Sequence, residues 1–468
     1  MNKLTRMIWT AQALGWENLP RRVLQIAKHK LKLLEKRLPA GELSADELRA
    51  HFTPDYAPAH ARQYWQNRAG AFGFSTDARK NLRAHLRTTI ADDSAASALR
   101  ANASRIAQGE FPYFNHRWEK PGNPPNFQHD PIHNVTWPTG QHWTTYGQFN
   151  PDRADLKCVW EASRFSWAYL LARAHVLDPA CDAARTFWSH FEAWDQQNPY
   201  GSTAQWACGQ ESSFRLFAWL FAASALLDSA ETTDARLARL TELVWYTGRH
   251  VAENIVYARS QKNNHAISEA AALWLIGSLF PELKAAEEWR AQGQRVLEAE
   301  VARQIYPDGS YVQHSLNYHR VMLDDLLLVL SVARRIGVAF SERLQAKFEA
   351  ATRWLLDFVD PDTGVVANYG ANDGALVLPL STCDYDDFRP VARAAAHFAA
   401  LPTRFERGPW DEKLFWLAGF DAVRTAEPTN PENFAESDES KTKRLGGGLA
   451  GSNENKQRSV GRRDGGYF

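Results

Sequence analysis

From about residue 155 onward, apolar residues recur at the spacing of an α-helix, in long segments separated by short intervals. This pattern predicts helices over residues 155–178, 182–197, 204–228, 232–259, 264–280, 283–305, 316–337 and 341–359. The alternation typical of strands is scarce. Helices joined by short connections are antiparallel neighbours, so the pattern indicates a series of helical hairpins.

The predicted helices are of two kinds. Residues 214–227 and 267–280 are apolar almost all round, whereas 283–305 carries many charges outside an apolar stripe. If every second helix lies in an inner layer, the inner helices begin near 155, 204, 264 and 316 and the outer helices near 182, 232, 283 and 341. The fold class predicted from this order is all-α, an (α/α) toroid or incomplete α/α barrel.

Composition shifts divide the chain into three predicted parts. Residues 1–104 are basic and helix-prone and are expected to form an N-terminal helical arm, and residues 105–425 hold the toroid, beginning with a stretch rich in Pro and Gly. Residues 426–468 are polar and have no apolar core, so we expect a disordered tail.

Inner helices of a toroid run in the same direction, so their N-termini lie on one rim, where free N–H groups and helix dipoles favour an anionic ligand. Polar residues at these starts should therefore share one cleft. The candidates are Trp160, Glu161 and Arg164 in the first helix, Trp206, Gln210, Glu211 and Arg215 in the second, Asn263, Asn264 and His265 in the third, Tyr318 and His319 in the fourth, and Asn372 in the loop 368–380, where the next inner helix should begin.

Several of these residues also have ordinary structural explanations. One of the two asparagines is explained as a helix cap, and Glu211 and Arg215 as an i,i+4 ion pair. Ser202 and Gln205 fit a capping box, and Ser315 is expected to cap the fourth inner helix. The second Asn and the His at 263–265 have no such explanation.

An Asn or His, a Tyr and an Arg on one rim are the groups needed to remove a proton next to a carboxylate. The C5 proton of a uronic acid is too weakly acidic unless its carboxylate is neutralised, for which Asn264, His265 or Arg215 is suited. Tyr318 could then act as base, as acid toward the departing glycosidic oxygen, or as both. The base role requires cationic neighbours that lower its ordinary pKa of about 10.

Five stretches resemble the heparinase II/III family of polysaccharide lyases, in the family's order and spacing. They are KCVWEASR at 157–164, NPYGSTAQWACGQESSFRLFAW at 198–219, NNHAISEAAALW at 263–274, QIYPDGSYVQHSLNYHR at 304–320 and NYGANDGA at 368–375. The resemblance covers about half the chain.

The resemblance implies a toroid followed by a β-sandwich domain, acting on uronate polymers such as heparan sulfate or alginate by β-elimination. It places Asn264 as the group that neutralises the substrate carboxylate, His265 beside it, Tyr318 as acid/base, and Trp206, Glu211 and Arg215 in the cleft. The β-sandwich should contribute a histidine and, in some members, a metal. In this chain DGGYF at 464–468 is similar to the opening of a first strand, so the expectation is a truncated β-domain.

Charge and cysteine content narrow the partners. Lys+Arg and Asp+Glu both number 54, which provides no global field for nucleic acid or an anionic membrane. The 4 cysteines lack zinc-ribbon spacing, and Pro131 separates His129 from His133, so neither a metal nor another cofactor is expected. An acidic polysaccharide is the expected partner, without nucleic acid or a transmembrane segment, and the sequence does not predict an oligomeric state. Relatives suggest the periplasm, but no plain export signal is seen, so the cytoplasm stays open.

Two other functions remain open at this point. A glycoside hydrolase on an α/α toroid would use paired carboxylates, for which Glu161, Glu211, Asp308 and Asp373 are candidates. An inactive remnant would bind a polysaccharide without cleaving it. Unsaturated, ultraviolet-absorbing products distinguish a lyase from both.

Overall fold

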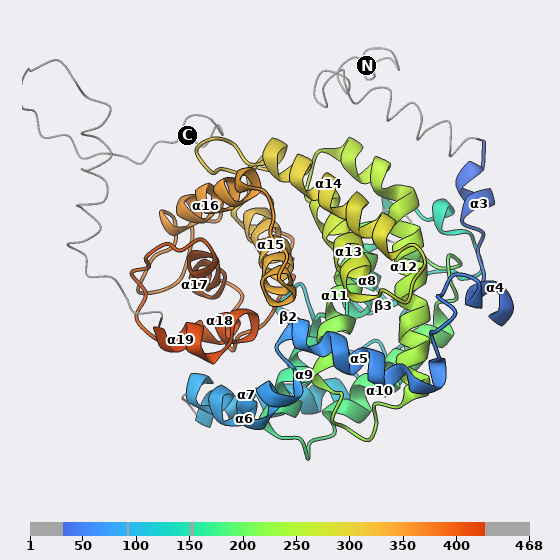
Figure 1. The fold of residues 1–468 in the computed structure, drawn as a ribbon, viewed down its shortest axis with the longest axis horizontal. Coiled ribbons are helices and arrows are strands. Elements are labelled where there is room, and N and C mark those ends of the chain that lie inside the picture. The colour runs from blue at the N-terminus through green and yellow to red at the C-terminus, as the bar shows by residue number, and fades with distance from the viewer. Residues whose placement is uncertain (1–30, 91–92, 148, 151–153, 426–468) are drawn as a thin grey trace, which may run out of the picture.

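The computed structural model describes residues 31–90, 93–147, 149–150 and 154–425. The chain is mostly helical, and its helices are arranged as an α/α toroid (Figure 1). The predicted tail at 426–468 and the first 30 residues of the predicted arm lie outside the described residues. The three-part domain division therefore stays a prediction.

Among the described residues, five α-helices and three small ladders precede the ring. The helices are α3 (Leu33–Arg37), α4 (Ala45–Arg49), α5 (Ala61–Ala69), α6 (Thr76–Ile90) and α7 (Asp93–Ala107). The antiparallel ladders pair β1 (Phe111–Tyr113) with β2 (Arg117–Glu119), β3 (His129–Asp130) with β4 (Val135–Thr136), and β5 (Phe149–Asn150) with β6 (Ala154–Asp155). The predicted scarcity of strands is confirmed for the described residues, where each strand has two or three residues.

Inner and outer helices alternate in the ring as predicted. The inner helices are α8 (Lys157–Ser163), α9 (Ser166–Leu177), α11 (Gly209–Ala225), α13 (His265–Leu279), α15 (Leu316–Ile336) and α17 (Arg389–Phe398). The outer helices are α10 (Ala183–Gln197), α12 (Asp234–Gln261), α14 (Ala286–Gln304) and α16 (Glu342–Leu356). Successive inner helices contact each other, α9 with α11, α11 with α13, α13 with α15, and α15 with α17.

The circuit of contacts is closed by helices from both ends of the described chain. Helix α17 contacts α18 (Asp411–Ala418), α18 contacts α6, and α6 contacts α9, while α19 (Phe420–Thr425) lies against α18. Blue and red ribbons accordingly lie next to each other in Figure 1. Helix α6, which takes part in this circuit, lies within the N-terminal arm predicted for residues 1–104.

Two predicted helices differ from the structure. The first inner helix is interrupted between α8 and α9 at Phe165, whose φ is 57°. The inner helix expected near Asn372 begins instead at Arg389, because the intervening residues form an irregular loop. That loop still brings polar residues to the rim.

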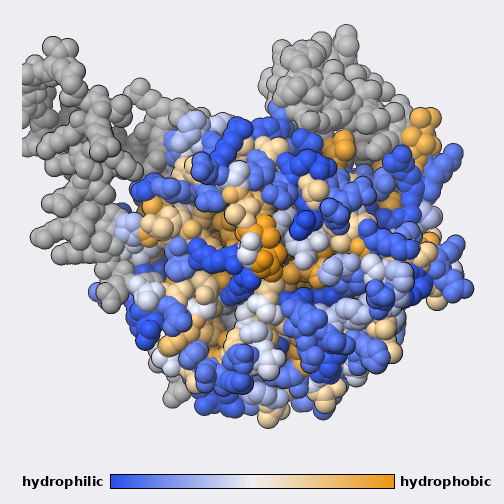
Figure 2. Space-filling view, in the orientation of Figure 1, coloured by the Kyte–Doolittle hydropathy of each residue, from blue (hydrophilic) through white to orange (hydrophobic). Residues whose placement is uncertain are grey.

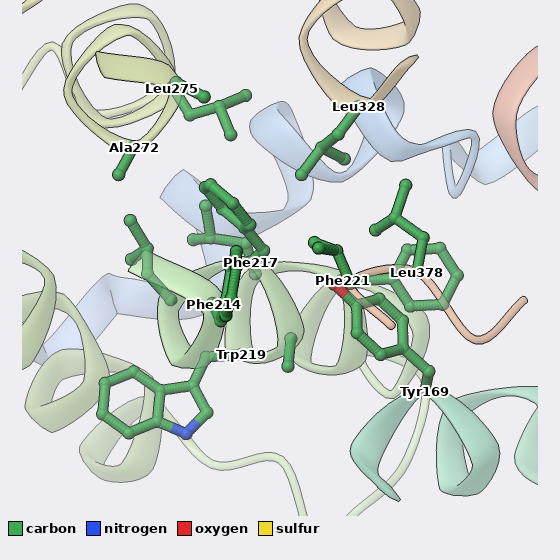
Figure 3. Packing of buried hydrophobic residues seen from close by; sticks show 14 of the residues in the cluster. Tyr169, Phe214, Phe217, Trp219, Phe221, Ala272, Leu275, Leu328 and Leu378 are labelled. Carbon is green, nitrogen blue, oxygen red and sulfur yellow. The ribbon is translucent and has the colours of Figure 1, made fainter. Parts of the chain in front are cut away.

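The core lies between the inner helices and the N-terminal helices. Phe217 and Trp219 of α11 are both fully buried. Phe217 lies on the side of α11 that faces Ala272 of α13 and Leu328 of α15, whereas Trp219 extends from the other side of the helix (Figure 3). Trp65 of α5 belongs to the same cluster, so one core extends across the predicted boundary at residue 105. Most of the tryptophans are packing residues, as expected for a helical protein.

The face shown in Figure 2 is largely hydrophilic, with apolar residues gathered near its middle. Within the described part of the chain, no helix combines the length and apolar character needed to span a bilayer.

Candidate active site

A cavity of about 600 Å³ lies at the N-terminal ends of α8, α11, α13 and α15. The rim predicted from helix parity therefore exists. Of the predicted site residues, those lining this cavity are Asn263, Asn264, His265, Tyr318, Gln210, Glu211, Trp160 and Arg164.

Asn264 holds the N-cap position of α13 without acting as its side-chain cap. Its backbone N–H donates to Gln313 Oε1 at 2.9 Å, and its carbonyl accepts from the N–H groups of Ile267 and Ser268. Asn263 Oδ1 accepts instead from the N–H of His265 at 3.2 Å. The side-chain amide of Asn264, buried at the cavity wall, has no hydrogen-bond partner among the described residues and is available to a ligand.

His265 follows at the first position of α13, with Nδ1 3.8 Å from Sγ of Cys208. Burial lowers the pKa of His265 to about 4. The imidazole is therefore uncharged at neutral pH. It can take part in hydrogen bonds to a substrate but does not supply a positive charge.

Tyr318 lies in the first turn of α15, where Ser315 Oγ accepts from its backbone N–H at 3.1 Å. The predicted cap is thus confirmed. The phenolic O–H of Tyr318 donates to Asp373 Oδ2 at 2.8 Å. Burial and the neighbouring Asp373 carboxylate raise the pKa of Tyr318 above its ordinary value. The condition for a resting phenolate is therefore not met, and the phenol is positioned as a proton donor.

Asp373 connects Tyr318 to a lysine at the start of α8. Lys157 Nζ donates to the same Oδ2 atom at 2.7 Å. Burial acts to raise the pKa of Asp373, but the hydrogen bond and charge of Lys157 outweigh it, and the net pKa is lowered. Asp373 is accordingly an ionised acceptor held between an ammonium and a phenol.

Arg164, at the C-terminal end of α8, binds two carboxylates. It makes a bidentate pair with Glu211, Nε to Oε2 at 2.6 Å and Nη2 to Oε1 at 2.8 Å, and it also binds Glu161. Glu161 additionally accepts from the N–H of Phe114 at 2.8 Å and is buried behind the cavity, so it does not line it. The i,i+4 ion pair expected between Glu211 and Arg215 is wrong.

Arg215 does not reach the cavity. Its guanidinium is fully buried, 4.4 Å from the ring centroid of Trp194 and 5.4 Å from that of Trp206, and it donates to the Gln205 carbonyl at 3.1 Å. Burial lowers its pKa to about 9. The expectation of Arg215 as a positive group facing the substrate does not fit this packing position.

Trp206 and His319 are also core residues in the structure. Trp206 is fully buried, and its Nε1 donates to the Asn198 carbonyl at 3.1 Å. His319 bonds the Ala351 carbonyl at 2.9 Å and stacks on Trp354, because its position next to Tyr318 on a helix directs it away from the cavity. Neither lines the cavity as predicted.

Asn372 lines a neighbouring cavity that shares Asp373 with the first. Its Oδ1 accepts from the Tyr385 hydroxyl at 2.6 Å.

The capping box expected from Ser202 and Gln205 is also wrong, because Thr203 caps that turn by accepting from the Gln205 N–H at 3.4 Å.

Sequence reasoning did not assign site roles to several lining residues, among them His250, Asn254, Glu269 and Gln313. His250 and Asn254 lie in the second half of the outer helix α12, away from the inner-helix starts that the sequence pointed to, and Gln313 lies in the loop before α15. Glu269 did have a signal, since it is the one charged residue in the apolar run ISEAAALWLIGSLF.

One group of potential metal ligands lies outside this cavity. The ligand atoms of Asp130, His133 and Cys158 lie within 4.8 Å of one another. Asp130 Oδ2 is bonded to His133 Nδ1 at 2.7 Å, and its Oδ1 accepts from two backbone N–H groups of the β3–β4 turn. The turn itself thus accounts for the placement of Asp130 and His133, and Cys158 reaches them from α8.

Comparison with known proteins identifies the family. The family model described as Heparinase II/III N-terminus matches residues 55–376, which include every residue that lines the cavity except Leu34. The chain belongs to the heparinase II/III family.

Curated members of the heparinase II/III family match parts of the chain. A heparin-sulfate lyase of Bacteroides thetaiotaomicron is 38% identical over 177 residues, 38% of this chain and 24% of that protein. A heparin-sulfate lyase of Pedobacter heparinus is 26% identical over 193 residues, 39% of this chain and 28% of that protein. The matched segments therefore span about a quarter of each relative's length.

The solved structure of a heparan sulfate lyase from Pedobacter heparinus is similar over 68% of this chain and 48% of that chain, with 21% identity and a TM-score of 0.46.

Proposed function

We propose that this protein is a polysaccharide lyase that cleaves a uronic-acid-containing polysaccharide, heparan sulfate-like or alginate-like, by β-elimination. The observation that carries the proposal is the unpartnered amide of Asn264 in the same cavity as the phenol of Tyr318, from the starts of two different inner helices. The names of the relatives favour a glycosaminoglycan over alginate.

Asn264 is assigned to the uronate carboxylate. Hydrogen bonds from a preorganised donor stabilise the enolate-like state that follows loss of the C5 proton. His265, uncharged at neutral pH, is assigned as a neighbour that orients the sugar.

Tyr318 and Asp373 form the proton path. As the phenolic oxygen takes the C5 proton, its own proton passes to Asp373 Oδ2, with which it already shares a 2.8 Å hydrogen bond. The C4–O4 bond then breaks, Tyr318 donates a proton to O4, and Asp373 returns its proton to Tyr318. The scheme leaves a C4–C5 double bond and no net change on the protein.

The test is incubation of the purified chain with heparan sulfate, chondroitin sulfate, hyaluronan, alginate and polygalacturonate while following the absorbance of unsaturated ends. We expect absorbance to rise with at least one polymer. Asn264→Ala and Tyr318→Phe should each lower kcat/KM by roughly 10²–10⁴-fold, the range for loss of an oxyanion donor or a general acid. Arg215→Lys serves as a matched control outside the cavity.

Full rates in both Asn264→Ala and Tyr318→Phe would contradict the assignment. Shortened products without absorbance would indicate a hydrolase, although Glu161 and Glu211 are both held by Arg164. Binding without any cleavage, unchanged in Tyr318→Phe, would indicate a polysaccharide-binding remnant.

A further inference from the structure

Glu269 is a buried carboxyl at the wall of the cavity that has no stated role. It lies one turn after His265 on α13 and is 3% exposed. Its Oε2 is buried without a hydrogen-bond partner, and neither oxygen bonds any group among the described residues. An isolated buried carboxyl costs stability unless it binds something or stays protonated.

The carboxyl packs directly against the first residue of α11. A Cβ at Gly209 would lie 2.6 Å from both Cδ and Oε1 of Glu269, so only glycine leaves room for the carboxyl in this place. The side chain is therefore held at the cavity between two helix starts, α13 and α11. A binding role explains this position, whereas packing alone would favour an apolar residue.

The charges of the cavity show why a neutral donor is needed there. Two cationic side chains, Lys157 and Arg164, line the described part of the cavity wall. Lys157 is paired with Asp373. Arg164 is paired with Glu211 and Glu161. An incoming uronate finds no uncommitted cation among these two. Its negative charge must be met by hydrogen-bond donors, and the Asn264 amide is one.

We propose that Glu269, in its protonated form, donates a hydrogen bond to the carboxylate of a bound uronic acid, sharing with Asn264 the neutralisation of that charge. The inference rests on the proposed function for its ligand class and adds a second carboxylate-binding group. The O–H stays on Glu269 in the bound state, and no covalent step is involved.

The protonation state agrees with this role. Burial raises the pKa of Glu269 to about 8, so the carboxyl is protonated at neutral pH. Of the groups around it, His250 and His265 have lowered pKa values of about 3 and about 4, and burial raises the pKa of the Cys208 thiol well above its ordinary value.

On the facing wall, the pKa of Tyr318 is raised above 10, that of Asp373 is lowered and that of Arg164 is raised. Lys157 and Glu211 are held in ion pairs there. Between pH 7 and 9, ionisation of Glu269 is thus the change of charge that we expect to alter the affinity for an anionic ligand.

Two substitutions separate donation from packing. Glu269→Gln keeps a donor of the same shape and cannot ionise, whereas Glu269→Leu keeps the volume and removes the donor. Both are made in a Tyr318→Phe background, in which cleavage is expected to be slow. Binding of heparan sulfate and alginate oligosaccharides is measured by calorimetry at pH 6.5 and pH 9.

The background protein should lose about tenfold in affinity between pH 6.5 and pH 9, because ionised Glu269 repels the uronate. With Glu269→Gln the change should be under twofold. Glu269→Leu should bind at least tenfold more weakly at both pH values. Gly209→Ala, which displaces the carboxyl without removing it, should also weaken binding at pH 6.5.

The proposal would be overturned if Glu269→Gln still lost tenfold in affinity between pH 6.5 and pH 9. It would also be overturned if Glu269→Leu bound the oligosaccharides as tightly as the background protein. If the binding pattern holds but the wild-type protein yields no unsaturated ends, the lyase assignment fails and the Glu269 assignment stands. If neither oligosaccharide binds at pH 6.5, the Glu269 assignment fails, and the lyase assignment is decided by the unsaturated ends alone.

Discussion

At the scale of single residues, the site depends on two polar groups that the fold leaves without a hydrogen-bond partner and on one phenol that is paired with a carboxylate. Asn263 takes the local hydrogen bond at the start of α13, which leaves the Asn264 amide free. Tyr318 has an acceptor already in place in Asp373. Glu269 has no acceptor or donor among the described residues. A folded chain retains such costly groups where a ligand completes their bonding.

The unusual protonation of Glu269 predicts a pH-dependent stability difference. The unfolded carboxyl ionises near its ordinary pKa of 4.5, whereas the folded one stays protonated up to about pH 8. Between these values the unfolded chain binds fewer protons, so wild-type stability falls as pH rises. Glu269→Gln lacks this linkage.

The stability advantage of Glu269→Gln over wild type should therefore grow by on the order of 4 kcal/mol from pH 5 to pH 9, measured by urea unfolding of both proteins. A difference that stays constant across this range would mean that Glu269 is ionised in the folded protein.

At the scale of helices, periodicity predicted most of the ring. The segments from 182 to 359 correspond to α10 through α16 with shifts of a few residues at most ends. The break at Phe165 and the late start of α17 were not predicted, because a positive φ and a long irregular loop depend on tertiary contacts. For the same reason, burial of Arg215 and Trp206 could not be separated from exposure on the rim.

The close packing of α13 against α14 predicts a large effect from a small substitution. A Cβ at Gly293 of α14 would lie 2.5 Å from the backbone N of Trp274 and 2.7 Å from the Ala270 carbonyl of α13. Alanine has the higher helix propensity, yet it would force the two backbones apart. We expect Gly293→Ala to lower the free energy of unfolding by about 1–3 kcal/mol.

Gly70→Ala is the matched control, since its added Cβ meets only Ser75 at an ordinary 3.7 Å. Chemical denaturation of both variants measures the difference. Equal stability of Gly293→Ala and wild type would show that α13 and α14 pack less closely than the structure indicates.

At the scale of the whole molecule, closing the ring is what gathers the site. Asn264 and Tyr318 are 54 positions apart in sequence, and Asp373 lies 55 beyond Tyr318. They meet because parallel inner helices begin on one rim, which the sequence did predict from helix order. The contribution of α6 and α18 to closure was not predicted, since it depends on contacts between segments from opposite ends of the described chain.

The measurement that tests this convergence most directly is a double-mutant cycle on the formation of unsaturated ends, using Asn264→Ala, Tyr318→Phe and the double variant. Groups that act on one transition state lose activity non-additively. We predict that the double variant has a kcat/KM within about tenfold of the worse single variant. Losses that multiply fully would show that Asn264 and Tyr318 act independently and would contradict the account.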